Sequence, residues 1–144
     1  MKKYWMNVLA LVLLIFTVQL YNNVALAQDY EVKGEIAFPF DWKPLIKDAN
    51  GQVTVVDVDD KYKLLIKEEF TGPTNSNELF NFSAKPIEES KINFSHTYRC
   101  VVLLHVNQAD NKYSQYWGRV NFQFKKDVPV KDLGIVLLEI VEIK

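Results

Sequence analysis

The sequence predicts an all-β protein, built as one antiparallel two-sheet β-sandwich of about seven strands, of immunoglobulin-like or prealbumin-like type. Three observations support this fold class. Runs of strand length that are rich in β-branched and aromatic residues recur through residues 28–144. Turn-forming residues separate these runs at the spacing of an all-β domain. The length of this region corresponds to a single domain.

The first two predicted strands lie on either side of a loop. Residues 29–38 (DYEVKGEIAF) alternate apolar and polar side chains, as a strand with one buried face does. Pro39 and Pro44 bracket the loop that follows. The Asn50-Gly51 pair is a strong turn signal, and residues 52–58 (QVTVVDV) are predicted to form a strand after it.

The middle of the chain continues the same pattern. Strands are predicted over residues 61–69 and 78–83, and the second is expected to end before Pro86. Residues 71–77 (TGPTNSN) have the composition of a loop.

The last part of the chain contains a predicted hairpin and a final strand. Residues 96–107 and 114–125 are expected to pair through a short connection. The final segment, 133–143, could place Val136, Ile140 and Ile143 on one face of a helix. Its richness in β-branched residues favours a strand.

Residues 1–27 are predicted to be a cleavable secretory signal peptide, which leaves residues 28–144 as the mature domain. Lys2 and Lys3 precede an apolar run over 8–18, and the small-x-small sequence Ala25-Leu26-Ala27 ends the segment. The apolar run is shorter than the roughly 18 to 20 residues that span a bilayer. We therefore expect a soluble periplasmic or extracellular protein, with an uncleaved N-terminal anchor as the alternative. Because no cysteine stands at the predicted cleavage point, lipid attachment there is not expected.

Composition limits the classes of partner. The chain has 17 basic and 18 acidic residues, and removal of Lys2 and Lys3 with the signal leaves 15 against 18, a net charge of −3. This mildly acidic domain has no cluster of basic residues, so nucleic acid is not an expected partner. A single cysteine excludes an internal disulfide.

The stretch HTYRCVVLLHVN (96–107) contains the only cysteine, Cys100, between the only two histidines, His96 and His105. On a strand, His105 would point away from Cys100, and His96 would lie on the same face about 13 Å away. A Cys–His nucleophile requires contact at about 3 Å. We therefore expect Cys100 to be a buried core residue, with pairing of two chains through the thiol as the main alternative.

No cofactor and no metal site is predicted. Asp57, Asp59 and Asp60 form the densest acidic group, but no glycine provides the sharp turn of a calcium loop and Lys61 follows directly. A solvated turn between strands is the expected interpretation. Two histidines with no supporting spacing also give no zinc pattern.

The strand around residue 117 provides the candidate binding site. Alternation puts Tyr113, Trp117 and Arg119 on the otherwise polar face of YSQYWGRVNFQF (113–124). Exposed aromatic and arginine side chains are typical of recognition surfaces, and they also stack on sugars or peptides. The alternative is that the loop 41–47 folds over Trp117 and buries it.

No catalytic motif is found, so an enzyme is not expected. Asn81 and Asn93 each begin an Asn-Phe-Ser tripeptide that fits the N-glycosylation pattern, which matters only in a eukaryotic source.

Residues 80–106 (FNFSAKPIEESKINFSHTYRCVVLLHV) resemble the central part of small periplasmic sandwich proteins related to type III secretion pilotins. In that family an F-x-F-like strand leads through a proline-containing connection to a long apolar strand, and Phe80, Phe82, Pro86, Ile92 and Tyr98 fill those places. The resemblance implies a non-enzymatic pilotin or chaperone that holds an outer-membrane partner segment. Pilotins are usually lipoproteins, and this chain lacks the cysteine after its predicted signal.

A second resemblance is to prealbumin-like, carboxypeptidase-regulatory-type domains. The stretches VDVDDKYKLLI (56–66) and VKDLGIVLLEI (130–140) are similar to their D-x-D-G-x-Y-x-L strand entry and their terminal L-G-x-I-x-L strand. Asp60 stands where that family has glycine. This resemblance implies a domain that binds or supports rather than catalyses.

Together these observations predict a non-enzymatic protein-binding accessory module for an envelope assembly. Its expected partner is an envelope or secreted protein, bound through the face of Tyr113, Trp117 and Arg119 or through an exposed sheet edge. The alternative is a protein that binds a small carbohydrate or lipid-like ligand through the same aromatics.

Overall fold

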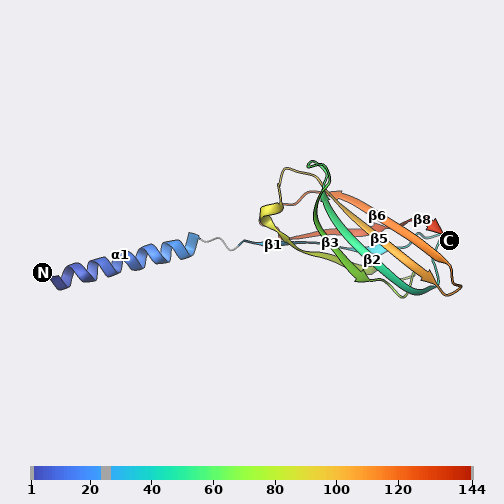
Figure 1. Ribbon diagram of the computed structural model, residues 1–144, viewed down its shortest axis with the longest axis horizontal. Coiled ribbons are helices and arrows are strands. Elements are labelled where there is room, and N and C mark those ends of the chain that lie inside the picture. The colour runs from blue at the N-terminus through green and yellow to red at the C-terminus, as the bar shows by residue number, and fades with distance from the viewer. Residues whose placement is uncertain (1, 24–26, 144) are drawn as a thin grey trace.

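The computed structural model describes residues 2–23 and 27–143 (Figure 1). Within them the elements run in the order α1 (Lys2–Asn23), β1 (Asp29–Ala37), β2 (Ile46–Asp57), β3 (Lys63–Thr71), β4 (Phe80–Glu88), η1 (Glu89–Lys91), β5 (Tyr98–Gln108), β6 (Tyr113–Phe122), β7 (Val130–Leu137) and β8 (Glu139–Ile143).

The strands form two packed sheets, so the predicted all-β two-sheet sandwich is confirmed. One sheet has the order β4-β1-β7, and the other has the order β3-β2-β5-β6-β8. The described strands number eight rather than about seven. The sandwich is also not wholly antiparallel, because β1 and β7 pair in parallel.

The core lies between the inner faces of the two sheets. Alternating residues of β1, β2, β5 and β6 point inward, which matches the period-2 patterning of the sequence. Aromatic rings meet edge to face within it, with ring centroids 4.9 Å apart for Tyr98 and Phe124 and for Phe38 and Tyr116. Every described core residue lies between Tyr30 and Leu138, so the sandwich carries a complete core without α1.

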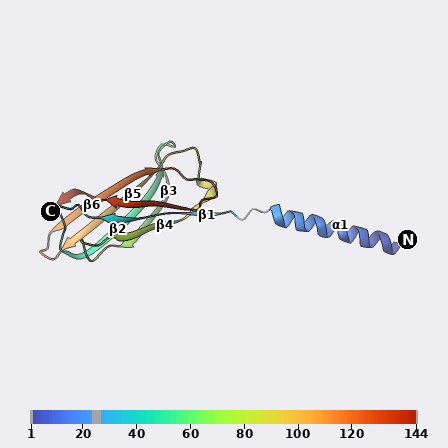
Figure 2. The same ribbon diagram turned by 180° about the vertical axis from the view of Figure 1, so that it is seen from behind.

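The helix α1 extends away from the sandwich in both views (Figures 1 and 2). No helix among the described residues combines the length and the apolar character needed to cross a bilayer. Of the predicted cleavage sequence, Ala25 and Leu26 lie outside the described residues.

The C-terminal segment is strand, as the β-branched residues predict, but it changes sheets halfway. Leu138 is fully buried between β7 and β8, and its N–H donates to the carbonyl of Ala37 at 2.9 Å. Gly118 permits the close approach of this segment to β6, because a Cβ there would lie 2.6 Å from Val136 Cγ1. One predicted strand therefore becomes β7 in one sheet and β8 in the other.

Two local predictions were wrong. Asn50-Gly51 lies inside β2 rather than in a turn, because Gly51 is buried and gives Phe70 of β3 the space to pack across the strand. Pro86 lies inside β4 rather than beyond its end. Proline is compatible with this position because β4 is an edge strand. On the open side of an edge strand, a backbone N–H is not needed for pairing with a neighbouring strand.

Two further corrections concern the start of β5. The strand begins at Tyr98, so His96 lies in the preceding turn rather than on the strand. The turn after β2 is also not fully solvated, because Asp57 is buried, whereas Asp59 and Asp60 are exposed as expected.

Candidate functional site

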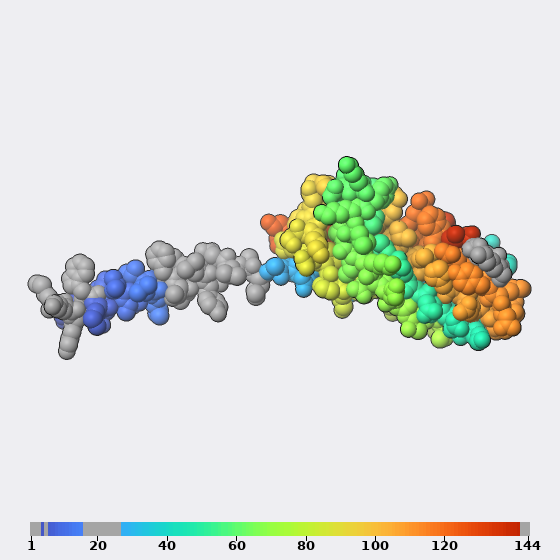
Figure 3. Space-filling view, in the orientation of Figure 1, coloured from blue at the N-terminus to red at the C-terminus, as the bar shows by residue number. Residues whose placement is uncertain are grey.

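The outer face of the five-stranded sheet carries the predicted binding residues. Strand register places Trp117 of β6 opposite Leu103 of β5 on one side and Glu139 of β8 on the other. One outward row further along, Arg119 lies opposite Val101. In the space-filling view, this side of the molecule shows β3 in green, β2 in teal and the β5–β6 pair in amber to orange, side by side at the surface (Figure 3).

We use the term Trp117 face for the residues at the centre of this surface. They point outward from four neighbouring strands in register and leave apolar area accessible on an otherwise polar sheet. The Trp117 face consists of Val56, Leu64, Arg99, Val101, Leu103, Trp117 and Arg119.

The structure brings together two of the three predicted residues. The Arg119 guanidinium lies over the Trp117 ring, 5.0 Å from its centroid, which is cation–π geometry. Tyr113 is placed apart from this pair, at the start of β6. Its ring stacks on His105 with centroids 5.9 Å apart, and its hydroxyl is hydrogen-bonded to His105 Nδ1.

The loop 41–47, which is the alternative cover for Trp117, makes its contacts at one end of the sandwich. The Ala109 N–H donates to the carbonyl of Leu45, and the Ser76 hydroxyl donates to the carbonyl of Pro44. Trp117 is half-buried within its own sheet, and its upper ring face is occupied by Arg119. The contacts of this loop therefore favour an open Trp117 face.

One hollow lies beside the Trp117 face, and a second lies at one end of it. The first, of about 460 Å³, lies towards Tyr113 and is lined by polar groups that include Asn50, Gln52, Glu69 and His105. The second, of about 320 Å³, is lined by Arg99, Arg119 and Asn121.

Arg99 is a residue of the site that our sequence reasoning missed. Its guanidinium lies 5.6 Å from the centroid of the Tyr62 ring, and its Nε–H donates to Asn121 Oδ1 at 2.8 Å. The sequence does contain a pattern that could have identified Arg99. The alternation that turned His105 outward also turns Arg99 outward, and the register of the β5–β6 hairpin then sets it beside Asn121.

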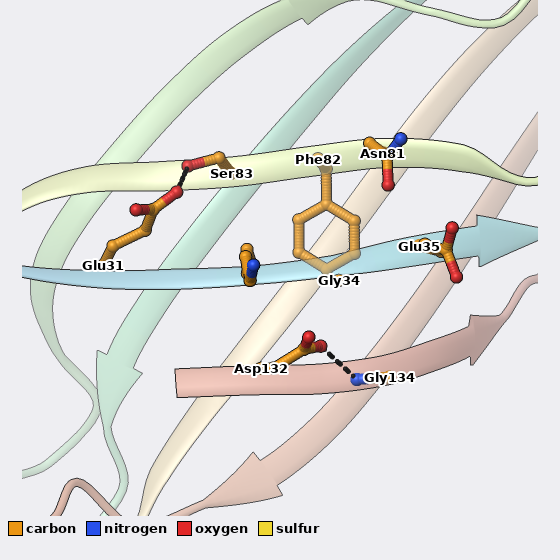
Figure 4. Close-up of a pocket in the computed structure, with 9 residues that line it drawn as sticks. Glu31, Gly34, Glu35, Asn81, Phe82, Ser83, Asp132 and Gly134 are labelled. Carbon is orange, nitrogen blue, oxygen red and sulfur yellow. Dashed lines mark hydrogen bonds between the residues drawn. The ribbon is translucent and has the colours of Figure 1, made fainter. Parts of the chain in front are cut away.

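A larger hollow, of about 590 Å³, lies on the outer face of the three-stranded sheet (Figure 4). Its polar groups are partly satisfied within the protein. The Ser83 hydroxyl donates to Glu31 at 2.6 Å, and the Gly134 N–H donates to Asp132 at 2.9 Å. Tryptophan and arginine are absent from its lining, so we place the candidate site on the other sheet.

Cys100 is part of the core, as predicted, whereas the two histidines lie outside it. Cys100 is 1% exposed, and burial raises the pKa of its thiol to about 12. His105 points to the outer face, away from Cys100. His96 binds Asp57 instead, with 2.7 Å between His96 Nδ1 and Asp57 Oδ2. Within residues 2–23 and 27–143, no group of three potential ligand side chains is arranged to hold a metal ion.

Solved structures of other proteins share part of this arrangement of strands. An alternative pilotin from the type II secretion system of Vibrio cholerae is similar with a TM-score of 0.53 and 18% identity, over 80% of this chain and 99% of that protein. A fimbrial assembly protein from Parabacteroides distasonis is similar with a TM-score of 0.45 and 12% identity, over 78% of this chain and 53% of that protein. No protein-family model and no curated protein matches the chain.

The predicted resemblance to secretion pilotins is therefore confirmed at the level of the fold. The similar protein belongs to a type II secretion system, whereas the sequence motifs suggested type III pilotins. At this identity the likeness concerns the arrangement of strands.

Proposed function

We propose that this chain is a non-enzymatic accessory protein of an envelope assembly, and that it binds a protein partner through the Trp117 face. The observation that carries the proposal is the pairing of Trp117 with Arg119 on the outer surface of the five-stranded sheet. The pilotin-like fold supports it, because the similar protein is described as a pilotin of a secretion system.

The composition of the Trp117 face fits protein recognition. Tryptophan and arginine are enriched among residues that dominate binding energy, and aliphatic side chains around them exclude water. Here Val101 and Leu103 lie beside the two residues in register. Leu64, at the far side of the face, is 54% exposed and adds apolar area.

The location that we propose is the periplasm or the extracellular space, reached through the predicted signal peptide at residues 1–27. The pilotin-like fold is consistent with an envelope location. Attachment by a lipid at the predicted cleavage site is not part of the proposal, because no cysteine is present there.

Site-specific photocrosslinking in the native source tests this function. p-Benzoylphenylalanine is introduced at Gln115, which points outward one row from Trp117, and separately at Lys33 on the outer face of the other sheet. We expect a discrete crosslinked protein from Gln115 and none of the same mass from Lys33. Equal crosslinking from both positions, or none from Gln115, would contradict the proposal.

Two tryptophan variants make the test specific. Trp117→Ala should weaken partner binding about tenfold or more, as removal of a central aromatic anchor does. Trp42→Ala is the matched control, because Trp42 is a partly exposed tryptophan in the loop between β1 and β2. Binding that is lost equally in both variants would argue against the Trp117 face.

A small-ligand function is the second candidate, favoured by the polar hollow next to the stacked Tyr113 and His105 rings. Amide and carboxylate groups beside an aromatic ring are the usual means of holding a sugar. In residues 28–144 with Trp42→Phe, Trp117 is the single tryptophan. A saturable change in its fluorescence on titration with a neutral oligosaccharide would support this function, and no change would exclude that ligand.

A further inference from the structure

The hollow lined by Arg99, Arg119 and Asn121, which we call the basic hollow, lies at one end of the Trp117 face and is rich in hydrogen-bond donors. Arg99 uses its Nε–H on Asn121 Oδ1 and keeps the four N–H groups of its two terminal nitrogens. Since arginine can only donate, the oxygen of Asn121 must face it, which leaves the Asn121 NH₂ group for a ligand. Arg119 adds five further N–H groups. A ligand for this hollow must therefore be rich in acceptors.

Neither guanidinium group forms an ion pair with a described side chain. In the register, Arg99 faces Asn121 and Val101 faces Arg119, so the two arginines are diagonal neighbours across β5 and β6. Two like charges at this spacing repel each other, and an anion between them would remove that cost.

Aromatic rings hold both guanidinium groups over the sheet. Arg99 lies over Tyr62, at 5.6 Å, and Arg119 lies over Trp117, at 5.0 Å. Each stacked arginine loses side-chain freedom before a ligand arrives, so less entropy remains to be lost on binding.

We propose that Arg99, Arg119 and Asn121 form an anion subsite that receives a carboxylate side chain of the partner protein. Arginine forks match the planar, two-oxygen geometry of a carboxylate. The neighbouring Val101, Leu103 and Trp117 provide apolar contact for the residues around that carboxylate. This inference rests on the proposed function, and it specifies the partner's chemistry as an acidic residue flanked by apolar ones.

Nuclear magnetic resonance of ¹⁵N-labelled residues 28–144, which contain the complete core, tests the subsite. The probe is the capped tripeptide acetyl-Leu-Glu-Leu-amide, and its matched control is acetyl-Leu-Gln-Leu-amide. We expect the glutamate peptide to shift the Asn121 side-chain amide and the Nε–H signals of both arginines. The glutamine peptide should bind about fivefold more weakly, the factor of one partly exposed charge pair.

Variants of the protein provide a second test of the subsite. The double variant Arg99→Gln and Arg119→Gln should lose the preference for the glutamate peptide. Lys33→Gln, on the other sheet, removes a positive charge elsewhere and should retain that preference. Equal binding of the two peptides, no shift of the three signals, or shifts with inorganic phosphate but not with the glutamate peptide would each overturn the carboxylate assignment.

The crosslinking experiment separates this inference from the proposed function. If the Gln115 crosslink disappears in Trp117→Ala but is unchanged in the double arginine variant, the protein-binding function stands and the carboxylate subsite is wrong. If the peptide preference is found but no crosslink forms from Gln115, the subsite stands and the proposed function fails.

Discussion

Asp57 and His96 form a hydrogen-bonded pair that joins the end of β2 to the turn before β5. Asp57 Oδ2 lies 2.7 Å from His96 Nδ1, and the side chains are 6% and 27% exposed. The other carboxylate oxygen, Oδ1, accepts the N–H groups of Asp59 and Asp60 at 3.0 and 3.1 Å. One buried carboxylate therefore orders two turns that lie far apart in the sequence.

The second ring nitrogen of His96, Nε2, faces a hydrogen-bond donor, which opposes protonation of the ring. The Asn93 oxygen accepts from the N–H and the hydroxyl of Ser95, so the Asn93 NH₂ group faces His96 Nε2 at 3.0 Å. This donor favours the neutral ring with its proton on Nδ1. The hydrogen bond and negative charge of Asp57 act in the other direction and raise the pKa of His96.

The first prediction concerns stability against pH. Burial disfavours ionisation of Asp57, but hydrogen bonds from His96 and the backbone outweigh it and lower the pKa of the carboxyl. The pair should stabilise the fold fully between the ordinary pKa values of aspartate and histidine, 3.8 and 6.5. Its contribution should fall above this window as pH rises through the raised pKa of His96, and below it as pH falls through the lowered pKa of Asp57.

Urea unfolding of the wild type and of Asp57→Asn, at pH values inside this window and on both sides of it, measures the contribution as a difference in free energy of unfolding. A difference that does not change with pH would contradict the prediction. The histidine signals give an independent measurement, because Asp57→Asn should lower the pKa of His96 and Asn93→Ala should raise it further.

Much of the fold was predictable because alternation fixes which face each side chain takes. The inward placement of Tyr116, Phe122 and Phe124 and the outward placement of Trp117 and Arg119 follow from period-2 patterning alone. The Asp57–His96 pair was not predictable in this way, since it depends on how β2 lies against β5. Arg99 became part of the site for the same reason, through strand register rather than local sequence.

Turns predicted from local composition were wrong where tertiary packing requires a different backbone conformation. Asn50-Gly51 favours a turn by composition, yet the glycine is used to accommodate a ring from the neighbouring strand. The sequence predicts the final segment as one strand, because nothing in its alternation marks Leu138 as the point where the chain passes from one sheet to the other. That transfer depends on the small Gly118 of β6 and on the carbonyl of Ala37, both distant in sequence.

A second prediction compares two fully buried tyrosines. The Tyr98 hydroxyl accepts the Asn93 N–H at 2.8 Å and donates to the Asn93 carbonyl at 3.1 Å. By contrast, no group in the described part of the chain meets hydrogen-bond geometry with the buried Tyr116 hydroxyl, which lies near the polar side chains of Ser114 and Trp42. Tyr98→Phe should therefore lower the free energy of unfolding by about 1–3 kcal/mol, and Tyr116→Phe should leave it unchanged or raise it by up to about 1 kcal/mol. Chemical denaturation of both variants gives the comparison. Equal losses would show that the Tyr116 hydroxyl is bonded in solution.

A third prediction concerns the thiol. Cys100 is buried and its pKa is raised to about 12, so its thiolate population near neutral pH is very small. Iodoacetamide should leave the native protein unmodified and alkylate it once per chain in denaturant, as intact mass would show. Ser90→Cys places a second thiol at an exposed position and should give one label per native chain. If Cys100 in the native wild-type protein were alkylated as fast as the exposed thiol of Ser90→Cys, the assignment of Cys100 to the core would be contradicted.

The last prediction tests why a glycine lies in the middle of β2. A Cβ on Gly51 would lie 2.1 Å from Phe70 Cζ, and the Phe70 ring is itself stacked on Phe80 with centroids 5.8 Å apart. Gly51→Ala should therefore displace the ring and lower the free energy of unfolding by about 1–3 kcal/mol. In a Phe70→Ala background the ring is absent, so the loss of unfolding free energy caused by Gly51→Ala should nearly vanish, and a double-mutant cycle measures this coupling.

Gly134→Ala is the control, because Gly134 has a φ of +67° with nothing within 4 Å of the added Cβ. Its cost is backbone strain and should be the same with or without the Phe70 ring. An equal cost of Gly51→Ala in both backgrounds would mean that the glycine is required for the conformation of β2 rather than for the packing of Phe70.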